Sequence, residues 1–278
     1  MIKNWLITGD THGRTNSRLH EIDTSKYIPE ETAIIILGDA GINFYLNKTD
    51  RKNKEFINKS GFHVYAVRGN HEQRPQNILG MERDWDMLVS GPVHYEPDFP
   101  RIRYFVDGGE YIINGYSVLT IGGAYSVDKW YRLSRAGYCS EEAEAETADP
   151  KKCGWFKDEQ LTKEEMEAIS TKCKGKNYDL ILTHTCPISW EPTDLFLGGV
   201  DQKAVDKSME LWFDEFKDEI NWKVWLFGHY HADRLERPRV EMFFNDIEDL
   251  NVIWERWNSN KELDWWLIKS PNYYFDEV

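Results

Sequence analysis

Eight side chains that offer oxygen or imidazole nitrogen ligands follow apolar segments that end abruptly. They are Asp10, His12, Asp39, Asn70, His71, His184, His229 and His231. Carboxylate, imidazole and amide ligands together suit Mn, Fe, Zn or Ni better than calcium. A carboxylate can bridge two cations through its two oxygens, so one central aspartate with terminal ligands on either side would hold two metals about 3.5–4 Å apart. A single histidine at a strand end is more often structural, but turn chemistry alone does not explain ligand residues at five such ends.

The spacing of two ligand pairs indicates how their side chains are directed. Asp10 and His12 are two residues apart, as are His229 and His231. On an extended backbone, residues two apart point to the same side. The two side chains of each pair are therefore expected to point to the same side.

The segment RGNHE, residues 68–72, holds more polar side chains than a simple turn requires. A turn needs only the glycine and the asparagine, so Arg68 and His71 are surplus to chain reversal. The planar guanidinium of an arginine can bind two phosphate oxygens at once, which suggests that Arg68 contacts phosphate. The alternative is that Arg68 is a surface charge, as most arginines are.

Five apolar runs position these side chains, and each is typical of a strand buried on both faces. They are NWLITGDTHG (4–13), AIIILGDAG (33–41), FHVYAVRGNHE (62–72), YDLILTHTCP (178–187) and KVWLFGHYH (223–231). Polar stretches of helical length separate the first three, which predicts an α/β fold with functional groups at the carboxyl ends of strands. In residues 101–126, short β-prone segments and the Asn114-Gly115 pair predict an antiparallel sheet with a hairpin. Two sheets packed face to face, with helices outside, follow from this pattern.

Two helices can be recognised in the second half of the chain. Thr162 and Glu165 have capping-box spacing at the start of the first. The second has one apolar face, formed by Val205, Met209, Trp212 and Phe216.

Two segments have no clear role in this pattern. Residues 128–156 are polar and long for a connection, so we expect an irregular insertion that acts either as a lid or as a solvated surface loop. Residues 240–257 suggest another hairpin, within a Trp-rich segment at about 240–278. Its tryptophans could stack a base or a partner, but a packed core is the more frequent use of such rings. They are Trp254, Trp257, Trp265 and Trp266.

Composition restricts the class of protein and of partner. A chain of 278 residues suits a single domain, 1–278, with insertions. The formal net charge of −14 and the lack of a basic stripe argue against an extended nucleic acid as partner. Four cysteines without a CxxC pair and a start that is not a signal peptide favour a reduced, cytoplasmic chain. No run of about 18 apolar residues occurs, so no membrane partner is expected.

The motifs GDTHG, GDAG, RGNHE, THTCP and GHYH, in this order over residues 9–231, resemble those of the calcineurin-like metallophosphoesterases. RGNHE also resembles the version found in Ser/Thr protein phosphatases, whose arginine contacts phosphate. The resemblance implies a four-layer α/β/β/α sandwich, with two mixed sheets flanked by helices, and a site for two divalent metals, with Mn favoured. By position, the resemblance implies that the ligands of one metal are Asp10, His12 and His231. It implies that those of the other metal are Asn70, His184 and His229. Asp39 would be the bridge between the two metals, and His71 would assist the leaving group.

The resemblance further implies hydrolysis of a phosphoric ester by a hydroxide held between two cations. The substrate would be a small or protein-borne phosphate ester, cleaved by a phosphatase or phosphodiesterase. Many relatives have a second aspartate three or four residues after the bridge, where this chain has Ile42 and Asn43. Asn43 can accept a hydrogen bond from imidazole but cannot stabilise imidazolium as a carboxylate would. Two alternatives stay open: a non-catalytic metal-binding scaffold of the same fold, and a nuclease, which the acidic charge disfavours.

Overall fold

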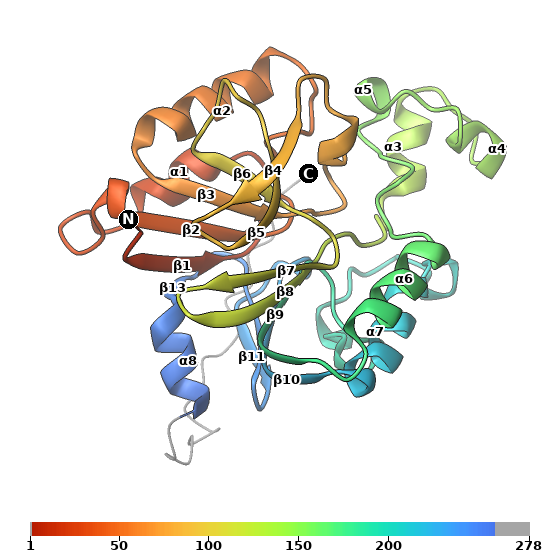
Figure 1. Cartoon of the computed structure of the whole chain (residues 1–278). Helices are drawn as coiled ribbons and strands as arrows, with labels where there is room; N and C mark the ends of the chain where they lie inside the picture. Colours follow the sequence, from red (N-terminus) through yellow and green to blue (C-terminus); the bar gives the residue numbers. More distant parts are fainter. Residues whose placement is uncertain (1, 259–278) are drawn as a thin grey trace.

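The computed structural model describes residues 2–258, and its strands form two sheets that pack face to face (Figure 1). The strand order is β13-β1-β2-β3-β6-β5-β4 in the first sheet and β11-β12-β10-β9-β8-β7 in the second. The first sheet consists of β1 (Asn4–Thr8), β2 (Thr32–Leu37), β3 (His63–Val67), β4 (Glu82–Asp86), β5 (Gly91–Tyr95), β6 (Ile102–Phe105) and β13 (Ile247–Asp249). The second consists of β7 (Gly109–Ile113), β8 (Tyr116–Ile121), β9 (Asn177–Thr183), β10 (Asn221–Phe227), β11 (Arg234–Arg237) and β12 (Val240–Met242).

Helices cover the outer faces of both sheets. The first sheet is covered by α1 (Thr15–His20) and α2 (Lys48–Ser60), and the second by α6 (Lys163–Cys173) and α7 (Ser208–Glu219) (Figure 1). The last helix, α8 (Leu250–Asn258), packs against β1 and β13. Single turns of 3₁₀ helix occur at Pro29–Glu31, Pro75–Asn77, Ile188–Trp190, Thr193–Leu195 and Gln202–Ala204. The predicted α/β/β/α sandwich is thus confirmed.

Three apolar layers hold the sandwich together. Between the sheets, Ile35 of β2 and Leu182 of β9 belong to one buried cluster. On the outer faces, Ile57 of α2 packs with the first sheet and Phe213 of α7 with the second. Burying a side chain of this size stabilises the fold by roughly 1.5–3 kcal/mol. All six residues of β2 are buried, as expected for a strand with an apolar layer on each side.

The five predicted strands are confirmed, and within each sheet they pair with one another in parallel. The first three are β1, β2 and β3, paired in parallel in one sheet, and the other two are β9 and β10, paired in parallel in the other. Their last residues are in register, as in the pairs Leu37 with Val67 and Phe227 with Thr183. The loops that follow these strands therefore emerge at the carboxyl ends of both sheets.

The segments predicted as antiparallel sheet are only partly so. Asn114 and Gly115, with φ of 53° and 84°, form the predicted two-residue turn between β7 and β8. However, β6 belongs to the other sheet, where it pairs in parallel with β3, so residues 101–126 do not form one sheet.

The hairpin predicted for residues 240–257 is wrong. β12 lies in the second sheet beside β10, whereas β13 pairs with β1 in the first sheet and α8 follows directly. Leu250, Ile253 and Trp257 are buried on one face of this helix, at spacings of three and four residues. That helical spacing outweighed the β-prone composition of the segment.

Other local predictions for the second half of the chain are confirmed. Thr162 and Glu165 form the reciprocal capping box at the start of α6. Met209 and Phe216 are buried on α7, but Val205 precedes that helix. Trp254 packs on Tyr116 with ring centroids 4.5 Å apart, and Trp257 is buried, so both serve the core. Trp265 and Trp266 lie outside the described residues.

The insertion at 128–156 is more ordered than the sequence suggested. It forms three short helices, α3 (Lys129–Arg135), α4 (Glu142–Ala145) and α5 (Pro150–Cys153), beside the sandwich (Figure 1). Its own small core contains Leu133, Ala145, Cys153 and Trp155, which explains why the segment is not an irregular loop. Within residues 2–258, no helix has both the length and the apolar character needed to cross a membrane.

Candidate metal centre

The loops that follow β1, β2, β3, β9 and β10 are tied to one another by hydrogen bonds. The backbone N–H groups of Thr11 and His12 both donate to the carbonyl of Asp39, at 3.1 and 2.8 Å. The N–H of His71 donates to Asp39 Oδ1 at 2.8 Å, and that of His229 donates to Asp10 Oδ1 at 3.0 Å. The aspartate carboxylates therefore organise loops from both sheets around one centre.

Four of the predicted ligands have an unusual backbone conformation. His12, Asp39, His229 and His231 have φ of 45°, 45°, 71° and 52°, in the left-handed region that non-glycine residues rarely adopt. Such residues cost about 1–3 kcal/mol each and cluster at functional sites. The predicted extended backbone at His12 is therefore wrong. The side chains still converge, because tight turns aim them at the same point.

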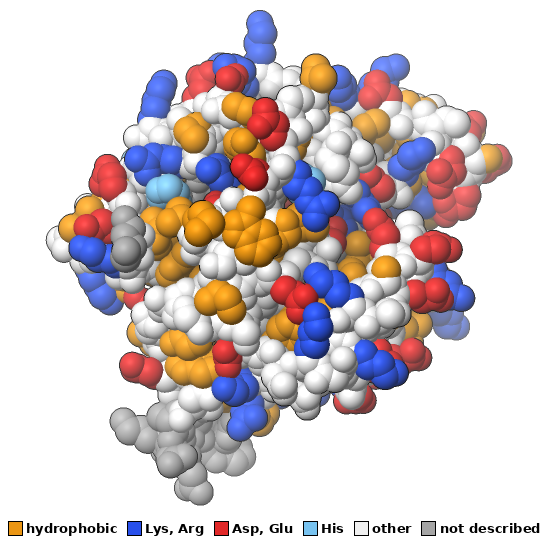
Figure 2. All heavy atoms as spheres, viewed as in Figure 1, with side chains coloured by type: hydrophobic (Ala, Val, Ile, Leu, Met, Phe, Trp, Pro, Cys, Tyr) orange, Lys and Arg blue, Asp and Glu red, His pale blue; other side chains and the backbone are white. Residues whose placement is uncertain are grey.

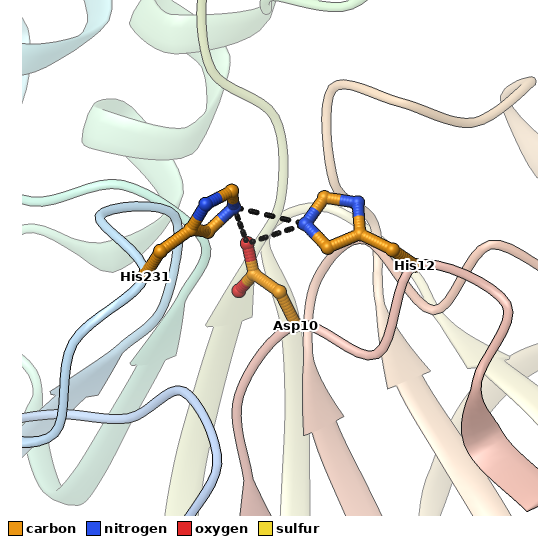
Figure 3. Close-up of side chains that lie close together, drawn as sticks. All are labelled: Asp10, His12 and His231. Carbon is orange, nitrogen blue, oxygen red and sulfur yellow. Dashed lines mark hydrogen bonds and ion pairs between the residues drawn. The ribbon is translucent and has the colours of Figure 1, made fainter. Parts of the chain in front are cut away.

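Asp10, His12 and His231 form the first ligand cluster. Figure 3 shows the two imidazole rings and the carboxylate pointing toward one another, with Asp10 and His12 on the loop after β1 and His231 on the loop after β10. The Nε2 atoms of the two histidines are 2.9 Å apart, and Asp10 Oδ2 is 3.7 Å from His12 and 3.4 Å from His231. Ligands about 2.1 Å from one ion, at angles of 90–110°, are roughly 3.0–3.4 Å apart. The cluster therefore has the dimensions of a divalent metal site.

The environment of the Asp10 carboxylate favours a bound cation at this cluster. Its Oδ2 atom is buried and makes no hydrogen bond of ordinary geometry within the described chain. Burial alone would raise the pKa of Asp10, but its interactions with the imidazoles of His184, His231 and His12 outweigh burial and hold the pKa below its usual value. An ionised, buried oxygen that faces ring nitrogens is a suitable metal ligand.

Asp10, Asp39 and His184 form a second cluster of potential ligands, joined by Asn70. His184 Nδ1 is 2.8 Å from the carbonyl of Leu37, which can only accept, so Nδ1 carries the hydrogen. His184 Nε2 therefore presents a lone pair, and it faces the Oδ1 atom of Asn70 at 2.8 Å. Two acceptors this close repel each other, and a cation bound to both relieves the repulsion. The donor set fits a second divalent metal.

His229 lies at the edge of the second cluster. Its ring centroid is 4.9 Å from that of His184. Burial lowers the pKa of His229 to about 3, so the ring is neutral and has a lone pair for a metal. The structure thus brings all seven predicted ligands to one centre, with Asp10 common to both clusters. Asp39 belongs to the second cluster, with its Oδ1 atom 3.7 Å from His184 Nε2.

A hydrogen-bond chain that the motifs did not reveal orients Asn70. Its Nδ2 donates to Ser126 Oγ at 2.8 Å, and Ser126 Oγ donates to Glu159 Oε2 at 2.5 Å. The backbone N–H of Ser126 also donates to Glu159, at 3.0 Å. These hydrogen bonds direct the amide NH₂ of Asn70 away from His184 and the amide oxygen of Asn70 toward His184. Ser126 and Glu159 belong to no sequence motif, so no signal in the sequence could have identified them.

Arg68 lies behind the ligands and not in the open part of the site. It is buried, and its Nε donates to Asp107 Oδ2 at 3.0 Å. Its two other nitrogens donate to backbone carbonyls, Nη1 to Glu159 at 2.6 Å and Nη2 to Gly122 at 3.1 Å. Every guanidinium nitrogen thus has a protein acceptor. The geometry favours a structural role for Arg68 over both the predicted phosphate contact and the alternative of a surface charge.

Gly69 and Glu72 complete the RGNHE turn. A Cβ atom on Gly69 would come within 1.9 Å of Asp39 Oδ1, so only glycine allows this approach. The backbone N–H of Gly69 donates to Glu72 Oε1 at 2.8 Å. Burial raises the pKa of Glu72 to about 8. Glu72 thus acts as an internal support of the turn.

His71 lies close to the first cluster, with its ring centroid 5.9 Å from that of His12. Burial lowers the pKa of His71 to about 4, although the carboxylate of Asp39 acts in the opposite direction. Its Nδ1 is buried and has no hydrogen-bond partner within residues 2–258. His71 is therefore a neutral imidazole beside the ligands.

Asn43 does not support His71. Its side chain is near the Tyr104 hydroxyl, and no hydrogen bond within the described chain joins it to His71. The charged groups that act on His71 from outside the ligand loops are Asp128 and Arg132 of the insertion.

Comparisons with known proteins show what this chain is similar to. A family model described as calcineurin-like phosphoesterase matches residues 4–233, whereas no curated protein matches. Among solved structures, TT1561 of Thermus thermophilus is 10% identical, with a TM-score of 0.45, covering 90% of this chain and 98% of that one. A phosphopantetheinyl hydrolase from Mycobacterium tuberculosis is 13% identical, with a TM-score of 0.43, covering 92% and 93%. Because the family model matches most of the chain, the chain belongs to the calcineurin-like phosphoesterases and is a hydrolase of phosphoric esters.

Proposed function

We propose that this chain is a phosphatase or phosphodiesterase that binds two divalent metals and acts on a small or protein-borne phosphate ester. The observation that carries the proposal is the pair of adjoining ligand clusters with Asp10 in common. Mn is the favoured ion, although the same ligands suit Fe, Zn or Ni. The proposed catalytic unit is a single domain, with the insertion beside its site.

The metal ligands have separate proposed roles. Divalent cations, when bound, lower the pKa of water and neutralise phosphate charge. His12 and His231 are exposed, whereas Asp10, Asp39 and His184 are buried, so the substrate approaches from the side of the two exposed histidines. Asp39 is the proposed bridge because its charge reaches both clusters.

His71 is the proposed catalytic residue for the leaving group. It is neutral at pH 7, because its pKa is lowered to about 4. A neutral imidazole can still donate an N–H hydrogen bond to the departing oxygen, but it does not act there as a charged acid. Arg68 is proposed to support the loop that carries Asn70 and not to contact substrate.

Surface charge supports a compact substrate. On the face seen in Figure 2, Lys and Arg side chains are interspersed with Asp and Glu. With a net charge of −14, such a surface gives a long polyanion little attraction.

The test is hydrolysis of a panel of esters by the chelated protein after Mn²⁺ is restored. An aryl phosphate, alkyl phosphates, an aryl diester and single-stranded DNA would be compared. Turnover of at least one ester that depends on added metal supports the proposal. Bound metal without hydrolysis of any ester would favour the scaffold alternative, and cleavage of DNA alone would favour a nuclease.

A further inference from the structure

The insertion has a cavity open to solvent that lies outside the metal centre. Its volume is about 320 Å³, and its lining includes Asp128, Tyr131, Arg132 and Arg135 of the α3 region and Lys152 of α5. Cavities that bind small molecules start at about this size. In a chain with a net charge of −14, three cationic side chains around one cavity are unusual.

The cations of this cavity are not neutralised by the residues around them. Arg132 is paired, since its Nε donates to Asp128 Oδ2 at 2.6 Å. Arg135 donates only to the uncharged Tyr131 hydroxyl, at 3.0 Å, and within residues 2–258 neither Arg135 nor Lys152 forms an ion pair. The acidic helix α4 uses Glu142 to pair with Lys129, which does not line the cavity. The cavity thus has two uncompensated positive charges.

One aromatic ring connects the cavity to the candidate catalytic residue. The Phe44 ring centroid is 6.4 Å from that of His71 and 5.5 Å from the guanidinium carbon of Arg132. Phe44 also contacts the start of the segment after α5, because a Cβ atom on Gly154 would be 2.9 Å from its Cζ. One ring thus contacts both the candidate catalytic residue and a residue that lines the cavity.

We propose that this cavity binds a second anionic group, a phosphate or a carboxylate, of the ester that is hydrolysed at the metal centre. The inference rests on the proposed function and makes the substrate class more specific: small phosphate esters that carry another anion. Arg132, held by Asp128, presents a preorganised planar fork, and Arg135 and Lys152 provide the excess charge. The insertion would then determine specificity and not merely cover the surface.

The experiment uses alkanediol bisphosphates of increasing chain length, each compared with the alkyl monophosphate of equal length. For the metal-loaded protein, we expect kcat/KM to favour the bisphosphate by roughly tenfold or more at the length that spans both sites. The double variant Arg135→Gln/Lys152→Gln should bring this ratio close to one. ω-Carboxyalkyl phosphates, tested in parallel, show whether a carboxylate replaces the second phosphate.

The matched control is the double variant Lys151→Gln/Lys157→Gln, which removes two exposed charges, one in the insertion and one directly after it, that do not line the cavity. It should keep the wild-type ratio. A wild-type ratio near one at every length would overturn the inference, as would a ratio that persists in Arg135→Gln/Lys152→Gln. Failure of the metal-loaded protein to hydrolyse any ester would instead refute the proposed function.

A binding measurement tests the cavity without catalysis. Inorganic phosphate would be titrated into the metal-free protein and followed by calorimetry. Binding that is several-fold weaker in Arg135→Gln/Lys152→Gln than in Lys151→Gln/Lys157→Gln supports the site. Equal phosphate affinity in the two double variants would contradict it, whatever the activity of the loaded enzyme.

Discussion

Replacement of Ser126 by alanine should weaken one metal site and leave the other intact. Ser126 Oγ accepts from Asn70 Nδ2 at 2.8 Å and donates to Glu159 Oε2 at 2.5 Å, and all three residues are buried. The variant leaves a buried donor and a buried acceptor unpaired, at a cost of about 1–3 kcal/mol each. Without this anchor the amide of Asn70 can rotate and present its NH₂ group to the metal. Loss of a residue that orients a ligand typically lowers metal affinity about 10–100-fold.

Calorimetric titration of the chelated protein with Mn²⁺ would measure this effect. We expect Ser126→Ala to raise the Kd of one site by about 10–100-fold, while the site built on His12 and His231 keeps its affinity. The matched control is Ser170→Ala, which removes the acceptor of the 2.9 Å hydrogen bond from Trp212 Nε1, between α6 and α7. The control should lose some stability but no metal affinity. If a folded Ser126→Ala protein bound both ions within about twofold of wild type, the proposed role of the chain from Asn70 to Glu159 would be refuted.

Four further changes test other parts of the site and of the fold. Asp39→Asn should reduce metal content and turnover more than loss of any terminal ligand, because a neutral amide bridges cations poorly; a larger loss in Asp10→Asn would assign the bridge to Asp10. His71→Ala should slow the hydrolysis of alkyl phosphates more than that of nitrophenyl phosphate, since a poor leaving group depends most on the N–H donor. The difference in rate should be smaller than the roughly 10²–10⁴-fold that is typical of full proton-transfer catalysis. Equal losses on both substrates would make His71 a positioning residue. Gly69→Ala should abolish metal binding, because its Cβ atom would collide with Asp39 Oδ1, and wild-type metal content in the folded variant would contradict this. Burial raises the pKa of Glu241 from 4.5 to about 7, so the folded state retains a proton that the unfolded state loses. The free energy of unfolding should therefore fall as pH rises from about 4.5 to 7, and Glu241→Gln should flatten this slope in denaturant titrations; an unchanged slope would show that other groups cause it.

The strands, and the convergence of the polar side chains that follow them, could be predicted because both depend on local patterns. Continuous apolar runs mark strands buried on both faces, and parallel strands bring their carboxyl ends to one edge, so the polar residues after them had to meet. The prediction failed where contacts distant in sequence decide the structure. Residues 240–257 have a β-prone composition, but α8 forms because Leu250, Ile253 and Trp257 can be buried together.

The supporting residues of the site could not be predicted for the same reason. The sequence displays the positive charge of Arg68 but not its acceptors, which come from residues 107, 122 and 159. Ser126 and Glu159 act on Asn70 across many positions and through single side chains that have no characteristic spacing. The left-handed turns at His12 and His231 also depend on the surrounding loops and not on residue type.

The most direct test of a two-metal hydrolase is to measure bound metal and turnover in the same titration. Chelated protein would receive Mn²⁺ in steps, with ion content per chain determined by elemental analysis and hydrolysis followed with an aryl phosphate. The proposed centre predicts that turnover stays low while the first ion binds and rises as occupancy goes from one to two ions per chain. Full turnover at one ion per chain, or without added metal, would contradict it.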